Sequence, residues 1–332
     1  MYALTHPPPP TLSLAEQERI RHYLEAGVAP ATRRAYQSSW EAWQRWCDAR
    51  QVLALPAAPE QIVAWLSERA EGAKVATLEK DLAALAAVHR IAELLGPRSH
   101  PAVRAVLRGI RRKKGVAQRQ VMALRVEDLR AALPRGEGAR VLRDRALLLV
   151  GFAGALRRSE LVALDHGDVE FRSEGLVLRL RASKTDPDRR GVLVAIPYAK
   201  RADLCPVRAL RCWKERCEGE GALFRSVNRW GKVGGRLSDR AVALLVKEAA
   251  RRGGLDPALY AGHSLRAGFA TSAVAAGVPE QAIMRQTRHR SVVVFRQYVR
   301  AGGLFLENAV GGFCEGIWGC LGRQRDHRRA IG

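Results

Sequence analysis

Apolar residues recur at helical spacing through the first third of the chain, and no β-rich stretch interrupts them. One stripe consists of Tyr36, Trp40, Trp43 and Cys47, and a second of Leu78, Leu82, Leu85 and His89, with Ile62, Trp65 and Leu66 between them. Steps of three and four residues place each stripe on one face of a helix. Such tryptophans either pack in a core or stack on bases, and the pattern favours packing. Residues 14–114 are therefore predicted to form a small all-helical domain.

The second part of the chain has a mixed pattern. Gly175–Arg181 and Gly191–Pro197 are each rich in β-branched and aliphatic residues, and the segment between them contains Gly, Pro and Asp residues. This pattern predicts two strands joined by a hairpin loop longer than the tightest turns. Helices are predicted at 126–133, 141–156, 158–164, 206–218, 238–252, 263–276 and 279–286. The expected fold class is mainly α with a small β-hairpin or sheet, α+β in type.

A basic segment joins the two parts. Between Arg104 and Arg119 lie seven basic residues and no acidic one, and Gly115 follows an Arg-Arg-Lys-Lys run. Residues 115–121 are predicted to be an interdomain linker. The basic side chains either follow a phosphate backbone or form a solvated face, and the charge of the whole chain favours DNA. The candidate DNA contacts are Arg108, Arg111, Arg112, Lys113 and Lys114.

The charge of the chain indicates a polyanionic partner. The formal net charge is +23, from 56 Lys and Arg against 33 Asp and Glu. A field of that sign attracts nucleic acid through counterion release. An anionic membrane is the alternative, but no Lys-rich amphipathic stretch is present, and the longest apolar run, Ala146–Leu156, is shorter than the about 20 residues that span a bilayer.

The N-terminal sequence bears on where the protein is located, and the spacing of the cysteines bears on whether it binds a metal. The first residues, with prolines at 7–10, show neither a basic nor an apolar region typical of a signal peptide. A cytoplasmic, nucleoid-associated location is therefore expected. The six cysteines form no CxxC pair and no zinc-like spacing. We expect reduced thiols and no bound metal.

Side chains in three short segments suit the attack of a phenol on a phosphodiester. In chain order they are Arg157, His263, Arg266, His289 and Tyr298, the last nine residues after the second histidine. Arginines can neutralise a phosphate, histidine can move a proton, and tyrosine can hold the covalent intermediate. Each residue also has a structural explanation, since Arg157 could pair with Glu160 one turn away and Tyr298 could belong to a core. The ordered set is more specific than any member.

These segments, in this order, resemble the catalytic motifs of the tyrosine recombinase (phage integrase) family. Ala155-Leu-Arg-Arg-Ser-Glu160 resembles the first arginine motif, and His263-Ser-Leu-Arg266 resembles the H-x-L-R box. His289 and Tyr298 have the spacing of the closing histidine and the nucleophile. Lys184, in Ser-Lys-Thr, occupies the hairpin position of the family's catalytic lysine. The resemblance covers about residues 14–305.

The resemblance implies that two arginines bind the scissile phosphate. Arg157 and Arg266 would hold its non-bridging oxygens in a bidentate manner, which lysine could not imitate. His289 would donate a further hydrogen bond to the same phosphate.

The resemblance also assigns the proton transfers. The phenol of Tyr298, with a free pKa of about 10, must lose its proton during attack, and His263 would be the base because imidazole titrates near working pH. Lys184 would protonate the departing 5′-oxygen. The 3′-phosphotyrosyl product conserves the energy of the phosphodiester, so no cofactor, nucleotide or metal is expected.

The family also implies a domain plan. The helical first part, with Thr32-Arg-Arg-Ala-Tyr36, resembles the family's core-binding, SAM-like DNA-binding domain. The expected divisions are 1–13, a disordered proline-rich lead-in; 14–114, the core-binding domain; 115–121, the basic linker; 122–305, the catalytic domain; and 306–332, a C-terminal tail.

The expected function is site-specific recombination of a mobile element or in chromosome maintenance. The expected partners are double-stranded DNA, further copies of the chain in a homotetramer on DNA, and a possible accessory factor for directionality. One alternative is a type IB topoisomerase that relaxes DNA. Another is a catalytically impaired DNA-binding protein of recombinase ancestry, against which the presence of Tyr298, Lys184 and both arginines argues.

Two positions depart from the family's pattern. Arg288 stands just before the closing histidine, where glycine is common. If the backbone there has a positive φ, arginine strains it by roughly 1 kcal/mol or more. The first arginine motif begins with Gly154-Ala155, where many members have Thr-Gly, a change expected to be mild.

Overall fold

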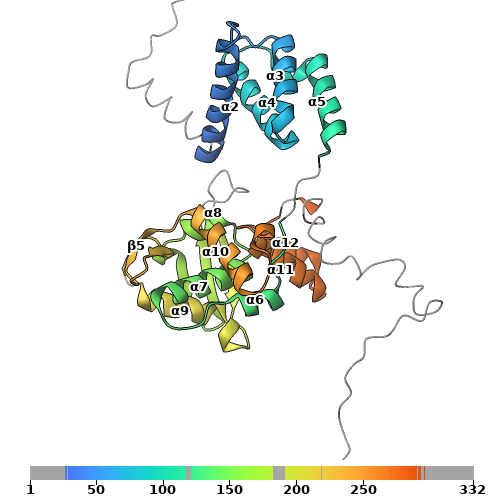
Figure 1. Cartoon of the computed structure of the whole chain (residues 1–332). Coiled ribbons are helices and arrows are strands. Elements are labelled where there is room, and N and C mark those ends of the chain that lie inside the picture. Colours follow the sequence, from blue (N-terminus) through green and yellow to red (C-terminus); the bar gives the residue numbers. More distant parts are fainter. Residues whose placement is uncertain are drawn as a thin grey trace, which may run out of the picture. The chain divides into compact units, whose positions relative to one another are not determined.

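The computed structural model describes residues 29–116, 121–181, 191–217 and 219–289, together with residues 27, 291, 292 and 295. The chain divides into two compact units, Met1–Arg119 and Gln120–Gly332 (Figure 1). Two predicted catalytic residues, Lys184 and Tyr298, lie outside the described residues. So do the predicted lead-in 1–13, the tail 306–332 and part of the linker.

The first unit is helical, as the sequence predicts. Its elements are α2 (Pro30–Asp48), α3 (Pro59–Gly72), α4 (Val75–Ile91), the 3-10 helix η1 (Pro97–Ser99) and α5 (Pro101–Lys114). Helices α2, α3 and α5 each begin with proline, whose fixed φ suits a first turn and whose missing N–H is not needed there. Helix α2 packs against α4, and α3 packs against α5.

Tryptophans form the centre of this first unit. Trp43 stacks on Trp46 with ring centroids 5.3 Å apart and meets Trp65 edge-on at 5.1 Å. Trp43 and Trp65 are buried, and the indole Nε1 of Trp43 donates to the Ala54 carbonyl at 2.8 Å. The interpretation of these aromatic residues as core is confirmed.

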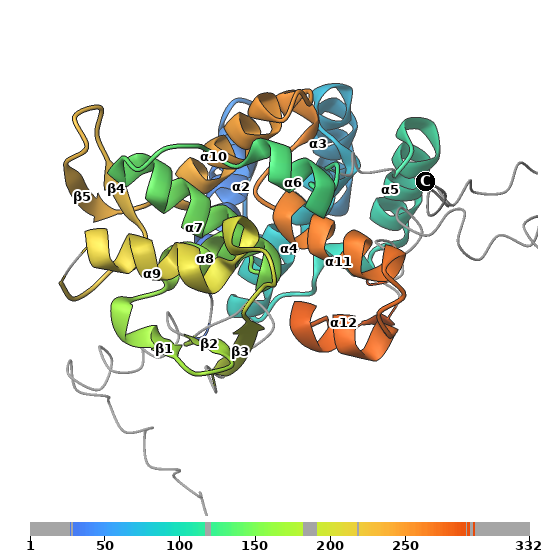
Figure 2. The same ribbon diagram turned by 90° about the horizontal axis from the view of Figure 1, so that it is seen from below.

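The second unit combines helices with two small sheets (Figure 2). Its helices are α6 (Val126–Ala132), α7 (Ala139–Ala153), α8 (Arg158–Ala163), α9 (Pro206–Arg216), α10 (Asp239–Arg252), α11 (Ser264–Ala275) and α12 (Glu280–Thr287), with 3-10 helices η2 (His166–Asp168), η3 (Ala202–Leu204) and η4 (Pro257–Leu259). Its strands are β1 (Val169–Phe171), β2 (Gly175–Leu180), β3 (Val192–Pro197), β4 (Arg225–Val227) and β5 (Val233–Arg236).

The predicted β2–β3 hairpin is confirmed, with Leu178 opposite Val194 in an antiparallel register. Strand β1 adds to the other edge of β2, in the order β1-β2-β3, and β4 pairs with β5 in a separate sheet. The sequence pattern does not predict β1, β4 or β5.

Helix α7 lies at the centre of the second unit. Consecutive residues Leu147, Leu148, Leu149 and Val150 are all buried, so α7 is covered on all sides rather than on one face. It packs most extensively against α9 and also contacts α11. In the described part of the chain, no helix is long and apolar enough to cross a membrane.

A close approach at Gly268 fixes α11 in this unit. The Leu124 amide donates to the Ser264 carbonyl at 3.0 Å, which brings the chain leading into α6 against α11. A Cβ added at Gly268 would lie 1.8 Å from the Leu124 carbonyl oxygen. Because that oxygen belongs to the backbone, only a residue without a side chain allows α11 to pack this closely.

We expect Gly268→Ala to displace α11 and to lower the free energy of unfolding of the second unit by about 1–3 kcal/mol or more, as overpacking does. Urea unfolding measures the change. Gly167→Ala is the matched control, because no heavy atom lies within 4 Å of a Cβ added at Gly167. Equal stability of the two variants would contradict the role of this close approach.

Candidate active site

The turn between α7 and α8 presents Arg157. The Ala155 amide donates to the Phe152 carbonyl at 2.9 Å and the Leu156 amide to the Gly151 carbonyl at 3.0 Å, which closes the end of α7. Ala155 has a φ of 46°, a left-handed conformation that glycine adopts without strain and alanine does not. The departure from the family's glycine therefore falls on a position whose positive φ favours glycine, and the mild effect of the change stays a prediction.

Glu160 holds Arg157 in place. Its Oε1 accepts from Nη1 of Arg157 at 2.6 Å, and its Oε2 accepts from the backbone amide of Arg157 at 2.9 Å. Glu160 is 3% exposed. The predicted pairing of Arg157 with Glu160 is thus confirmed. It does not exclude a role in binding, because the pairing fixes the orientation of the guanidinium.

Arg266 reaches the same turn from α11. It is 1% exposed, and its Nη1 donates to the Ala155 carbonyl at 2.9 Å. His263 is the exposed N-cap residue of α11. The residue before it, Gly262, lies so close to α8 that an added Cβ would be 3.0 Å from Cδ of Arg158. The two predicted arginines therefore converge on one short segment of backbone.

Arg288 directly follows the last residue of α12 and caps the helix, with a φ of 55° and a ψ of 42°. This positive φ meets the condition under which arginine strains the backbone at this position. The side chain turns inward, and Nη2 donates to Oε2 of Glu160 at 2.8 Å and to the Ala155 carbonyl at 3.1 Å. Nη1 donates to the carbonyls of Gly154 at 3.1 Å and Gln286 at 2.8 Å. The sequence does not predict these bonds; its only signal is the departure from glycine.

The ring of His289 is oriented by Thr287. The Thr287 hydroxyl donates to the Ile283 carbonyl at 2.7 Å, and its oxygen lies 2.8 Å from Nδ1 of His289. With the single hydroxyl hydrogen directed to the Ile283 carbonyl, Nδ1 is assigned as the donor of the second bond and Nε2 as the nitrogen that gains a proton. The ring of Phe295 lies 5.9 Å from that of His289, centroid to centroid.

A strong positive field surrounds His289. Its pKa is lowered to about 4, first by burial and then by the charges of Arg266, Arg157, Arg288 and His263. The four predicted residues that the structure describes, Arg157, His263, Arg266 and His289, therefore share one site. A field that opposes an imidazolium favours an anion, so this cluster is suited to a phosphate.

The structure describes residues that are close in sequence to Lys184 and Tyr298, although it does not describe these two residues. Strand β2 ends at Leu180 and β3 begins at Val192, so Lys184 belongs to the hairpin connection. Phe295, three residues before Tyr298 in the sequence, is buried in a small cluster with Ala270 and Ile283. The roles of Lys184 and Tyr298 stay predictions.

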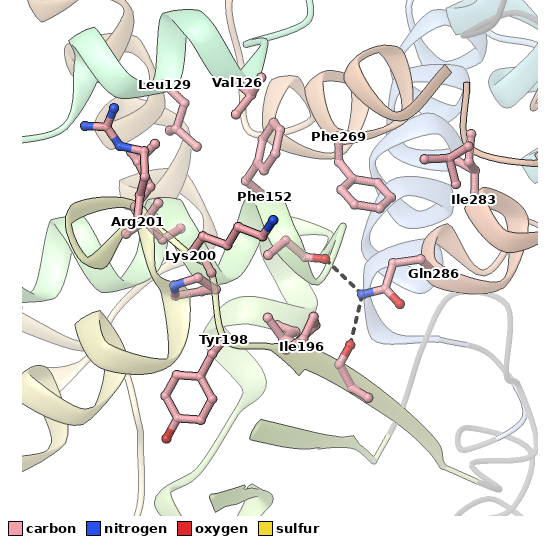
Figure 3. A pocket seen from close by; sticks show the side chains of 18 of the residues that line it. Val126, Leu129, Phe152, Ile196, Tyr198, Lys200, Arg201, Phe269, Ile283 and Gln286 are labelled. Carbon is pink, nitrogen blue, oxygen red and sulfur yellow. Dashed lines mark hydrogen bonds between the residues drawn. The ribbon is translucent and has the colours of Figure 1, made fainter. Parts of the chain in front are cut away.

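An apolar cavity of about 600 Å³ is lined by residues of α7, β3, α11 and α12, among others (Figure 3). Phe152, Ile196 and Phe269 contribute to its walls, and the described lining residues include none of the predicted catalytic side chains. Gln286 lies at its edge, where Nε2 donates to the carbonyls of Ala153 at 2.9 Å and Ala195 at 3.3 Å. These bonds attach α12 to the end of α7 and to β3.

The predicted DNA contacts in the first unit lie on helix α5. Two of them have partners within the unit: Arg111 pairs with Glu79, and Nζ of Lys114 donates to the Ala73 carbonyl at 2.8 Å, near the end of α3. The other three candidates, Arg108, Arg112 and Lys113, are exposed.

The sequence matches the phage integrase family over residues 120–302 and that family's N-terminal SAM-like domain over residues 20–94. An integrase/recombinase of Selenomonas ruminantium, described as a XerD homolog, is 40% identical over 300 residues, which is 88% of each chain. The tyrosine recombinase XerD of Mycobacterium tuberculosis is 26% identical over 87% of this chain and 93% of its own.

Solved structures share the fold. A lambda integrase dimer bound to a core site has a TM-score of 0.57 at 21% identity, over 85% of this chain and 93% of its own. A lambda integrase tetramer bound to a Holliday junction has a TM-score of 0.58 at 19% identity, over 85% of this chain and 75% of its own. The chain belongs to the phage integrase family. Its class is therefore that of the tyrosine recombinases, which break and rejoin DNA strands.

We expect the imidazole of His289 to titrate near pH 4 in the protein without DNA. Its folded pKa lies below the ordinary 6.5, so the unfolded chain holds more protons between these values and stability falls as pH is lowered through that window. NMR of histidine-labelled protein measures the midpoint, with His289→Gln to assign the resonance. A midpoint near 6.5 would contradict burial among the arginines.

Proposed function

We propose that the protein is a site-specific DNA recombinase that cleaves one strand at a time and forms a 3′-phosphotyrosyl bond at Tyr298. The observation that carries the proposal is that Arg157, Arg266 and His289 share one largely buried site, whose positive field favours an anion. In this proposal residues 14–114 form the core-binding domain and residues 122–305 the catalytic domain.

The two arginines stabilise the phosphate in attack. The pentacoordinate transition state carries more negative charge than the phosphodiester, so preorganised donors lower its energy more than that of the ground state. Glu160 and the Ala155 carbonyl hold Arg157 and Arg266 before substrate arrives, which avoids the cost of ordering them during the reaction.

His289 takes a proton at Nε2 when the phosphate enters, because the anion offsets the positive field that keeps the free ring neutral. The imidazolium then donates to a non-bridging oxygen, while Nδ1 remains bonded to Thr287. In this way a ring that is neutral in the free protein becomes a hydrogen-bond donor in the complex.

In the cleavage step the phenolic oxygen of Tyr298 forms a bond to phosphorus as the bond to the 5′-oxygen breaks. His263 accepts the phenolic proton, and Lys184 gives a proton to the departing oxygen. The reverse reaction with the 5′-hydroxyl of another strand rejoins DNA. Because the phosphodiester energy is conserved, neither nucleotide nor metal is required.

In this proposal the enzyme acts as a homotetramer on two duplexes in the cytoplasm, associated with the nucleoid, and an accessory factor sets its direction. The lambda integrase tetramer on a Holliday junction, which shares the fold, supports the tetramer. A type IB topoisomerase would relax DNA without exchanging strands, and an impaired relative would bind DNA without forming an adduct.

We expect the protein to form covalent adducts, in excess EDTA and without ATP, on a nicked suicide substrate that carries its recombination site. Tyr298→Phe should form none. Lys184→Ala should form adducts only when sulfur replaces the bridging 5′-oxygen, because the thiolate leaves without a proton. Denaturing gels measure the adduct. Adducts with Tyr298→Phe, or activity that requires magnesium, would contradict the mechanism.

We expect the exposed charges of α5 to contribute to DNA affinity without stabilising the fold. Neutralising Arg108, Arg112 and Lys113 to Gln should flatten the slope of log K against log salt by up to roughly 0.9 for each DNA phosphate that the variant no longer neutralises. Fluorescence anisotropy across salt concentrations measures it.

The matched control for that triple variant is Arg111→Gln with Lys114→Gln, which should lower the thermal stability of the first unit because both side chains have partners there. An unchanged salt slope in the triple variant would show that α5 does not face DNA phosphates. Weaker binding confined to one DNA sequence would indicate base readout instead.

A further inference from the structure

The Arg288 side chain is a largely buried cation to which the proposed mechanism assigns no contact with DNA. This side chain is 8% exposed, and its two terminal nitrogens make the four hydrogen bonds described above, all directed into the protein. A guanidinium in this position faces away from solvent, so it is not placed to bind a DNA phosphate. Its hydrogen bonds must serve another purpose.

Those bonds connect three separate segments of the second unit. The side chain joins the end of α12, through the Gln286 carbonyl, to the turn at Gly154 and Ala155 and to Glu160 in α8. Glu160 orients Arg157, and the Ala155 carbonyl also accepts from Arg266. One side chain therefore contacts both groups that orient the phosphate-binding arginines.

The chemistry of this interaction requires arginine. A planar guanidinium can donate in several fixed directions at once, whereas an ammonium is a point charge on a flexible stem. Burial opposes the ionisation of Glu160, but the charges of Arg288 and Arg157 and the hydrogen bonds from Arg157 outweigh it, so the pKa of Glu160 lies below its ordinary value. The ion pair is therefore charged and strongly hydrogen-bonded.

The backbone at Arg288 disfavours any residue with a side chain, because its φ of 55° is left-handed. The presence of arginine at a position suited to glycine means that the side-chain bonds outweigh this local strain. At this one residue the backbone conformation lowers stability and the side-chain hydrogen bonds raise it. A substitution can therefore separate the two effects.

We propose that Arg288 is a positioning residue, which holds the turn at 154–155 and Glu160 so that Arg157 and Arg266 are preorganised for the scissile phosphate. The inference rests on the proposed function for its catalytic consequence. The structural part of the proposal is that Arg288 orders the Arg157 amide through Glu160. This part can be tested without measuring activity.

Two variants test the side chain. Arg288→Gly removes the guanidinium and relieves the strained φ, so a loosened site in this variant cannot be attributed to a strained backbone. Arg288→Lys keeps the charge but not the planar fork. The matched control is Arg285→Lys, which makes the same replacement at an exposed position of α12, three residues earlier.

The first measurement is amide hydrogen exchange in the protein without DNA. If Arg288 orders Glu160, the amide of Arg157, which donates to that carboxylate, should exchange about tenfold faster or more in both Arg288 variants. The amide of Leu210 in α9 should not change. An Arg157 amide that exchanges as in the parent protein would overturn the proposal.

The second measurement is the single-turnover rate of adduct formation at saturating DNA. Misplaced arginines should slow cleavage roughly 10- to 100-fold with the dissociation constant for DNA unchanged, and Arg285→Lys should cleave like the parent. Low millimolar methylguanidinium should restore part of the rate in Arg288→Gly, by occupying the vacated site, and none in Arg288→Lys. A parent-like rate in both Arg288 variants would refute the catalytic part of the proposal.

The two measurements distinguish this inference from the proposed function. If the parent protein forms no adduct, the proposed function fails while hydrogen exchange still decides whether Arg288 orders Arg157. If Arg288→Gly does not fold, as circular dichroism would reveal, both the hydrogen exchange and the cleavage rate are measured on Arg288→Lys. Faster exchange at Arg157 with unchanged cleavage would refute the catalytic part.

Discussion

A single buried carboxylate organises the cations of this site. Glu160 accepts hydrogen bonds from the backbone and side chain of Arg157 and from Arg288. Ionic groups taken out of water are stable only when they are paired with good geometry. Here the pairing also fixes the orientation of the two guanidinium groups. The positions of α8, of the preceding turn and of the end of α12 all depend on this one ion-paired group.

Long helices such as α2 and α4 could be predicted from the sequence because their apolar residues follow the helical period over several turns. Strands β1, β4 and β5 have three or four residues each, which is too short for an alternating pattern to emerge. They exist because neighbouring strands supply hydrogen-bond partners, as β2 does for β1 with Val177 opposite Glu170. That pairing is a tertiary property, and local patterns do not contain it.

Much of the candidate site was visible as residue types in a fixed order, since the chemistry of phosphate transfer restricts which side chains can serve. What could not be predicted is how the site is held. The bond between Arg288 and Glu160 joins residues 128 positions apart, and the packing at Gly268 depends on a carbonyl in a distant segment. Similarly, the basic run on α5 did not reveal that Arg111 and Lys114 have partners inside the first unit.

The left-handed conformations of Ala155 and Arg288 have a consequence for how this sequence can change over time. The two residues are bonded directly, carbonyl to guanidinium, at 3.1 Å, and substitutions at contacting positions are seldom additive. The amino acid tolerated at either position therefore depends on the one present at the other. A lineage that exchanges one of these residues for glycine alters the selective value of the second exchange, so the two sites are expected to evolve as an epistatic pair.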